Sequence, residues 1–264
     1  MTTALPSLMD SHCHLNYDYS PKTCDDLIRE ARESGIHALI TVGTDLSSIS
    51  EIERISEKNA DVYHTVGVHP HDAIEMKDGD IHILESAARH PRCKAIGEIG
   101  LDYHYDHSPR EIQKARLDEQ LELALRVQKP IVIHSREGEE DLLVSLERYA
   151  KRLPAGAIPG VIHCFTGTRA FGEACLKLGF YISFSGILTF KNAGDIRECA
   201  RAFPMEKLLV ETDSPYLAPI PHRGKKCEPK MVRLTAEKLA EVKGLSIEEV
   251  ARITRENTEK IFQL

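Results

Sequence analysis

Short apolar runs alternate with amphipathic segments along nearly the whole chain. The apolar runs have the length of β-strands and are mostly continuous stretches of valine, isoleucine and leucine, which is typical of parallel strands covered on both faces. The sequence predicts eight strands: Leu8–Ser11, Ala38–Val42, Tyr63–Val68, Ala95–Ile99, Ile131–Ile133, Gly160–His163, Tyr181–Ser185 and Leu208–Glu211. Helical spacing between these runs indicates that strand and helix alternate eight times.

The amphipathic segments carry their own boundary signals. Asp25–Ser34 has apolar residues at helical spacing and is followed by Gly35, a residue suited to ending a helix. Arg110–Val127 repeats the pattern. Pro229–Phe262 fits one or two helices that close the barrel wall. The length of 264 residues is close to the roughly 250 residues that a (β/α)₈ barrel requires. We therefore predict the α/β class and a single (β/α)₈ TIM barrel, one domain over residues 1–264.

An open, doubly wound sheet is the competing α/β architecture. Such a sheet usually carries a glycine-rich phosphate loop after its first strand. Here the first strand leads into His12-Cys13-His14, and the sequence contains neither G-x-G-x-x-G nor G-K-[ST]. The motif pattern favours the barrel.

Composition restricts the setting and the partners. The chain is 42% hydrophobic and 28% charged, has no apolar stretch near the ~20 residues of a membrane helix, and begins with Met1–Ser7, which lacks the basic and apolar regions of a signal peptide. Seven cysteines without a C-x-x-C pair indicate free thiols in a reducing compartment. We expect a cytoplasmic protein with no membrane association, and a monomer or weak oligomer, because no long apolar stripe demands a partner.

The net charge of −7 argues against a protein that wraps long duplex DNA, whose binding surface is normally basic. It leaves room for an enzyme that grips one or two phosphates locally. Bound dications would add positive charge at that point, which formal counting omits.

Six side chains with metal-binding chemistry stand where predicted strands give way to loops: His12, His14, Glu98, His134, His163 and Asp213. The C-terminal ends of barrel strands converge at one rim, so a barrel would bring these distant residues together. Four imidazoles and two carboxylates suit a pair of divalent cations, Mg²⁺, Mn²⁺, Zn²⁺ or Co²⁺. Four histidines make Mg²⁺ alone the poorer fit, because it prefers oxygen ligands. We predict a metal-dependent hydrolase.

Local patterns support individual ligands and leave alternatives. His12 and His14 project to one face of a strand, with Asp10 on the same face as a candidate to orient a ligand ring. Glu98 is costly to bury unless paired, which predicts either a bridge between two cations or a salt bridge inside the barrel. Asp213 is a predicted ligand oriented by Glu211, although Asp-Ser-Pro is also a turn signal.

Several ordered motifs resemble the TatD-type metal-dependent deoxyribonucleases of the amidohydrolase-like barrels. They cover nearly the whole chain and include Asp10-Ser11-His12-Cys13-His14-Leu15, Gly67-Val68-His69-Pro70-His71, Gly97-Glu98-Ile99-Gly100-Leu101-Asp102-Tyr103, Ile133-His134-Ser135-Arg136, His163-Cys164-Phe165-Thr166-Gly167, Ser183-Phe184-Ser185-Gly186 and Glu211-Thr212-Asp213-Ser214-Pro215-Tyr216-Leu217. The resemblance implies metal binding at all six residues named above. One departure is Cys227, where the family usually has asparagine.

The resemblance also implies hydrolysis of DNA phosphodiesters, often from the 3′ end of single strands. In our hypothesis His12, His14, Glu98 and Asp213 hold one ion, and Glu98, His134 and His163 hold the other. Asp213 accepts the proton of the attacking water.

Three further residues receive hypothetical contacts with the substrate. His69 hydrogen-bonds a phosphate or the leaving oxygen, and Arg136 clamps a non-bridging oxygen or serves only as a surface charge at the next helix. Tyr103 stacks on a base or packs within the protein.

A second hydrolase on the same metal frame is the main alternative. It would be a deacylase acting on D-aminoacyl-tRNA, or an ester or lactone hydrolase, because fold does not fix substrate. A non-catalytic barrel ranks last, since all six predicted ligands are present.

Overall fold

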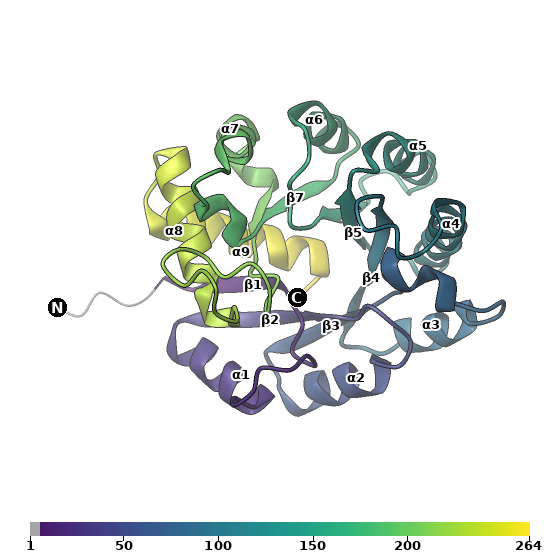
Figure 1. Ribbon diagram of the computed structural model, residues 1–264, viewed down its shortest axis with the longest axis horizontal. Coiled ribbons are helices and arrows are strands. Elements are labelled where there is room, and N and C mark those ends of the chain that lie inside the picture. Colours follow the sequence, from purple (N-terminus) through teal and green to yellow (C-terminus); the bar gives the residue numbers. More distant parts are fainter. Residues whose placement is uncertain (1–5) are drawn as a thin grey trace.

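A barrel of eight parallel strands forms the centre of the protein, as seen in a computed structural model that describes residues 6–264 (Figure 1). Each strand pairs with its neighbours in chain order. The strands are β1 (Leu8–Cys13), β2 (Ile36–Val42), β3 (Val62–Val66), β4 (Cys93–Asp102), β5 (Ile131–Arg136), β6 (Gly160–Ile162), β7 (Tyr181–Phe184) and β8 (Leu208–Val210). The predicted fold class and all eight strands are confirmed, with shifts of a few residues at their ends.

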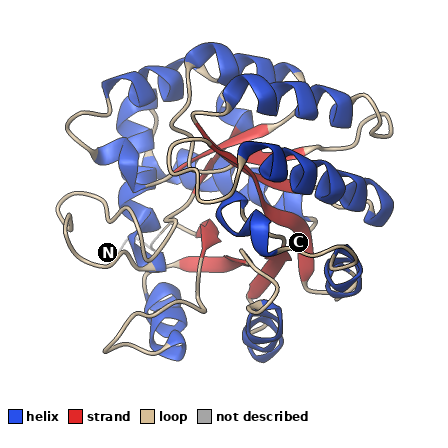
Figure 2. Ribbon diagram, turned by 45° about the vertical axis from the view of Figure 1, so that its right-hand side comes forward, coloured by secondary structure: helices blue, strands red, loops and turns tan. Residues whose placement is uncertain are grey.

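Helices surround the strands on the outside (Figure 2). They are α1 (Cys24–Glu33), α2 (Ile49–Lys58), α3 (Ile81–Ala88), α4 (Arg110–Val127), α5 (Glu139–Ala150), α6 (Arg169–Lys177), α7 (Gly194–Ala202), α8 (Val232–Lys243) and α9 (Ile247–Phe262). Short 3₁₀ turns occupy Pro70–Glu75, Gly186–Thr189, Met205–Lys207 and Pro229–Met231. The predicted final helical segment is thus one 3₁₀ turn and two helices.

None of the helices within residues 6–264 combines the length and apolar character needed to cross a bilayer. The first five residues of the segment behind the signal-peptide prediction, Met1–Ser7, lie outside the described residues.

Two large apolar clusters make up most of the core. The larger lies between the strands and the surrounding helices, as expected for parallel strands buried on both faces. The smaller fills the barrel interior with one or two side chains from most strands, and Ile261 and Phe262 of α9 pack into it. The C-terminal helix therefore adds apolar side chains to the inside of the barrel.

The junction between β8 and β1 carries polar links. Asp213 donates its backbone N–H to His12 O at 2.9 Å, and His14 donates to Ser214 O at 2.9 Å. The Asp10 carboxylate adds a second link by accepting from the Thr212 backbone N–H at 2.9 Å and from its hydroxyl at 2.6 Å. The strand ends that carry the predicted ligands are thereby held in register.

Gly97 and Gly100 allow β4 to approach β5 closely. A Cβ at Gly97 would stand 2.5 Å from Val132 Cβ. Gly100 has φ +151, and a Cβ there would collide with His134 O. Glycine is therefore required at both positions for β4 and β5 to pair this closely.

His64 on β3 makes folding stability depend on pH. Its Nδ1 lies 2.8 Å from Ser56 Oγ, whereas its Nε2 is buried and has no hydrogen-bond partner among residues 6–264. Burial, together with the charge of His90, lowers the pKa of His64 to about 3. Because the unfolded chain protonates His64 near pH 6.5 and the folded protein does not, stability is lost as pH falls from about 6.5 toward 3.

We expect the free energy of unfolding to fall by about 2 kcal/mol more between pH 7 and pH 5 in the wild type than in a His64→Asn variant. Urea unfolding at both pH values measures the difference. The imidazoles of the ligand cluster are common to both proteins and cancel. Equal pH dependence in the two proteins would show that His64 is not the cause.

Candidate metal centre

The six predicted ligands lie together at the C-terminal rim of the barrel. His12 is on β1, Glu98 on β4 and His134 on β5, while His14, His163 and Asp213 follow β1, β6 and β8 by one to three residues. Their nitrogen and oxygen atoms form groups in which all members lie within 4.8 Å of one another. These groups are His12, His14 and Glu98; His12, His163 and Asp213; and His69, Glu98 and His134.

Glu98 is the centre of the cluster. Its Oε1 lies 2.7 Å from His163 Nε2 and 3.1 Å from His134 Nδ1. Its Oε2 lies 3.3 Å from His12 Nε2 and 4.0 Å from His14 Nε2. One oxygen thus faces each half of the cluster, the arrangement expected of a carboxylate shared by two cations.

An irregular stretch of β4 aims Glu98 at the rim. The register with β5 shifts between Ile96 and Ile99, and the Glu98 backbone N–H donates to Gly43 O at 2.8 Å. Bulges of this kind redirect side chains next to functional sites.

The histidines keep this buried carboxylate ionised. Burial alone would raise the pKa of Glu98, but the charge of His163 and the hydrogen bonds from His12 and His134 outweigh it and hold the pKa well below its usual value. The same balance operates at Asp213, where burial is outweighed by the hydrogen bond from His14 and the charge of His12. Both carboxyl groups are therefore anionic near neutral pH, as ligands must be.

Outer hydrogen bonds fix which nitrogen of each ring faces the cluster. His14 Nδ1 donates to Val42 O at 3.1 Å, and His163 Nδ1 donates to the Glu211 carboxylate at 3.2 Å. His134 Nε2 donates to the Asp102 carboxylate at 2.9 Å. The remaining nitrogen of each neutral ring carries a lone pair directed at the centre, the pattern that orients metal-ligating imidazoles.

These residues fit divalent cations. His163 Nε2 is buried without a hydrogen bond from any described residue, although it lies 2.7 Å from Glu98. The Nε2 atoms of His12 and His14 face each other at 3.3 Å. Ring nitrogens and carboxylate oxygens that converge in this way repel one another unless a proton or a cation lies between them. The mixture of nitrogen and oxygen donors suits borderline divalent ions.

His69 lies in the same cluster but differs from the other rings. Its Nδ1 accepts the His71 backbone N–H at 3.1 Å, so in the neutral ring the proton is on Nε2, which lies 3.4 Å from Glu98 Oε1. Burial, partly offset by the charge of Glu98, lowers the pKa of His69 to about 4, so the ring is neutral near pH 7. Its hydrogen bonding favours a donor over a metal ligand, although His69 is itself a member of the third group.

Asp10 and Glu211 hydrogen-bond to other groups than the sequence predicted. The Asp10 carboxylate contacts the Thr212 backbone and hydroxyl and the His12 backbone N–H rather than an imidazole ring. Glu211 accepts from His163 and from the Cys164 backbone N–H at 2.7 Å, and does not orient Asp213. β8 ends at Val210, so Glu211 and Asp213 do not share a strand face.

Asp102 was missed at the sequence level. One of its oxygens accepts from both His134 and His71, the latter at 3.0 Å, and burial is outweighed by these two hydrogen bonds, which lowers its pKa far below the usual value. It stands four residues after Glu98 on β4, and residues at even spacing share a strand face. That spacing was the available signal.

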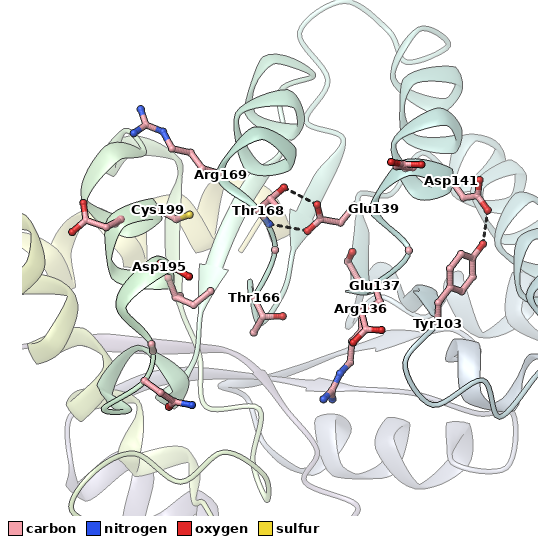
Figure 3. Close-up of a pocket in the computed structure, with 18 of the residues that line it drawn as sticks. Tyr103, Arg136, Glu137, Glu139, Asp141, Thr166, Thr168, Arg169, Asp195 and Cys199 are labelled. Atoms are coloured by element: carbon pink, nitrogen blue, oxygen red, sulfur yellow. Dashed lines mark hydrogen bonds between the residues drawn. The ribbon is translucent and has the colours of Figure 1, made fainter.

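Arg136 and Tyr103 line a cavity of about 1190 Å³ beside the cluster (Figure 3). The Arg136 guanidinium lies 4.7 Å from the centre of the Tyr105 ring rather than at a helix end. Tyr103 donates its hydroxyl to Asp141 at 2.7 Å, and Arg110 covers one ring face at 4.3 Å. Stacking of a base by Tyr103 therefore stays a prediction for its other face.

The cysteines lie outside the cluster. All seven are free thiols, as predicted. Cys13 donates its thiol to Ile40 O at 3.4 Å and Cys164 Sγ lies 3.2 Å from Ser185 Oγ, so neither is among the grouped ligand atoms. Cys227 is buried beside Ala218 and Met231.

A rim cluster of imidazoles around an ionised carboxylate, on a (β/α)₈ barrel, defines the class of metal-dependent hydrolases. The family model described as TatD related DNase matches residues 9–263, so the chain belongs to the TatD-related DNase family.

Its relatives match between three quarters and nearly all of the chain. The uncharacterized metal-dependent hydrolase YabD of Bacillus subtilis is 39% identical over 257 residues, covering 97% of this chain and 99% of that protein. The 3′-5′ ssDNA/RNA exonuclease TatD of Klebsiella pneumoniae is 34% identical over 196 residues, covering 74% and 73%. The crystal structure of the TatD homolog YJJV from Escherichia coli superimposes with a TM-score of 0.91 at 28% identity, covering 99% and 100%. The predicted family and hydrolase class are thereby confirmed.

Proposed function

We propose that this protein is a divalent-metal-dependent deoxyribonuclease that hydrolyses DNA phosphodiester bonds, acting in the 3′–5′ direction on single-stranded or short DNA. The observation that carries the proposal is Glu98, with one oxygen toward each half of the imidazole cluster. Membership of the TatD-related DNase family supports DNA as the substrate, and the relative from Klebsiella supports the direction of attack.

Two divalent cations would be held by the six predicted residues. His12, His14, Glu98 and Asp213 form one ligand set, and Glu98, His134 and His163 form the other. When bound, such cations supply Lewis-acid stabilisation of phosphate charge and lower the pKa of water.

The surrounding side chains handle the proton and the phosphate. Asp213 is anionic, and its side chain is 15% exposed, so it can accept the proton of an incoming water and later return it. His69 directs Nε2–H into the cluster, where it donates to a phosphate oxygen or the leaving oxygen. Arg136, at the end of β5, is placed for a non-bridging oxygen.

The rival hydrolase attacks a carbonyl rather than a phosphate. A D-aminoacyl-tRNA or an ester would use the same cations and the same proton acceptor. The acidic side of the neighbouring cavity, which includes Glu137 and Asp195, would attract the ammonium group of an aminoacyl substrate. This second function stays a prediction, and the experiment below distinguishes it from the nuclease.

We expect the metal-loaded protein to shorten a 5′-labelled single-stranded oligonucleotide from its 3′ end, and to lose this activity in EDTA and regain it when Mn²⁺, Mg²⁺ or Zn²⁺ is restored. Gel analysis of the products measures the direction, and D-aminoacyl-tRNA and a lactone are assayed in parallel. Release of no nucleotide from DNA with any of these metals would refute the nuclease, whereas release of a D-amino acid would establish the rival.

A further inference from the structure

Tyr216 is a large aromatic side chain held in solvent beside the metal centre. Tyr216 is 54% exposed. The ring of the buried His14 lies only 6.4 Å from the Tyr216 ring, measured between ring centroids. Tyr17 neighbours both residues, with its ring stacked on His14 at 4.7 Å and edge-on to Tyr216 at 6.1 Å. The three rings form one cluster beside a predicted ligand, and Tyr216 is its exposed member.

The backbone around Tyr216 is firmly positioned. Tyr216 donates its N–H to Asp213 O at 3.0 Å, which places it in a turn directly after a predicted ligand. Both Asp213 and Leu217 have φ near +57, and a Cβ at Gly186 would collide with Leu217 O. A ring fixed in this way presents a surface for stacking at little cost in conformational entropy.

A basic segment runs alongside this turn. Cys227 donates its N–H to Pro215 O at 2.9 Å, which ties residues 222–227 to the Tyr216 turn. The segment carries Arg223, Lys225 and Lys226, all exposed. Lys226 pairs with Asp18 at 2.7 Å, whereas in the described part of the chain no carboxylate lies within 4.0 Å of Arg223 or Lys225.

The opposite side of the metal centre has the other sign of charge. The cavity beyond β5 is lined by six carboxylate side chains and three arginines, and Glu139 and Asp195 are among those drawn in Figure 3. In a protein of net charge −7, the 222–227 segment is therefore the better path for a chain of phosphates.

We propose that Tyr216, Arg223 and Lys225 form a binding track for single-stranded DNA. The base next to the phosphate at the metal centre stacks on Tyr216, and the following phosphates contact Arg223 and Lys225. This inference rests on the proposed function in taking DNA as the substrate, and it adds where the strand lies. Stacking on an aromatic side chain tolerates any base, so the track selects single strands rather than sequences.

The absence of tryptophan from the chain provides a direct optical test. A Tyr216→Trp variant contains one tryptophan, at the proposed stacking surface. We expect a phosphorothioate-linked oligothymidylate, which resists hydrolysis, to quench the fluorescence of the metal-loaded variant with saturation. The matched control is Val144→Trp, which places one tryptophan on α5 at a residue that is 59% exposed, and it should not be quenched.

Affinity tests each part of the track separately. By fluorescence anisotropy, Tyr216→Ala should weaken binding of oligothymidylate by about 5- to 100-fold, the range for one stacked base, while Tyr216→Phe keeps the wild-type affinity. Loss of two phosphate contacts in Arg223→Ala/Lys225→Ala should reduce the slope of log affinity against log salt by about 1.4. The double variant Lys151→Ala/Lys177→Ala, at the C-terminal ends of α5 and α6, removes equal charge elsewhere and should leave the slope unchanged.

Failure of the track and failure of the nuclease are distinguishable. DNA binding without quenching of Tyr216→Trp, or no DNA binding at all, overturns the track. Hydrolysis of DNA by a protein that shows either result leaves the proposed function standing. Saturable quenching in a protein that cleaves no DNA with any metal supports the track and refutes the nuclease.

Discussion

A Glu98→Gln variant is expected to lose at least ~10³-fold in kcat/KM on single-stranded DNA, equivalent to about 4 kcal/mol of transition-state stabilisation. Glutamine has the same shape but only one acceptor oxygen and no charge. Glu98 faces four predicted ligand rings, with one oxygen toward His12 and His14 and the other toward His134 and His163. Neutralising it therefore weakens both ligand sets together.

Metal content and kinetics should change in parallel. Elemental analysis after dialysis is expected to show less metal per chain in Glu98→Gln than in the wild type. The matched control is Glu147→Gln, the same chemical change at an exposed residue of the neighbouring α5, which should retain both metal and activity. Full activity in Glu98→Gln, with unchanged metal, would mean that the carboxylate is not shared between cations.

The fold was predictable because each strand can be recognised from its own run of apolar residues. Continuous apolar runs such as Ile131–Ile133 have no amphipathic alternation, and only burial on both faces accommodates them. Their regular alternation with helical segments then restricts the topology to few arrangements, since strand–helix–strand connections are short and right-handed. The ends of strands were less predictable, because β4 continues to Asp102 past the polar residue Glu98.

The inner residues of the metal centre were predictable for a related reason. A histidine or carboxylate at the C-terminal end of a buried strand lies at one known rim of a barrel, so the sequence alone places His12, Glu98 and His134 together. The barrel rule says nothing about which outer residue each ring contacts. Glu211 reaches His163 from a neighbouring segment, and that pairing depends on local backbone geometry.

The positions of loop residues could not be predicted either, because they too depend on local backbone geometry. Tyr105 and Tyr216 gain their positions from turns, where side-chain direction follows individual φ and ψ values rather than a periodic rule. Tyr103, for which the sequence left base stacking and packing open, donates its hydroxyl to Asp141 and has one ring face covered by Arg110. An exposed aromatic beside a site is visible only once the backbone is known.

An Asp102→Asn variant is expected to bind metal about 10- to 100-fold more weakly, the usual effect of losing a partner that orients a ligand histidine. The carboxylate accepts from His134 Nε2 at 2.9 Å, and this bond keeps the ring's Nδ1 lone pair directed at Glu98. An asparagine can present its NH₂ group to His134, which favours the opposite tautomer. A His134 ring that rotates or changes tautomer no longer offers its Nδ1 lone pair as a metal ligand. Only the ligand set that contains His134 is affected.

The effect should be graded rather than total, which separates Asp102 from Glu98. Competition with a chelator measures the affinity of each ion. In Asp102→Asn only the ion held by the ligand set that contains His134 should bind more weakly than in the wild type. Asp106→Asn, four residues along in the same loop region and paired with exposed Arg110, removes equal charge without touching a ligand ring, and it should bind metal as the wild type does. Because Glu211 orients His163 in the same manner, Glu211→Gln should weaken the same ion, whereas simultaneous loss of both ions from Asp102→Asn would show that the two ligand sets do not act separately.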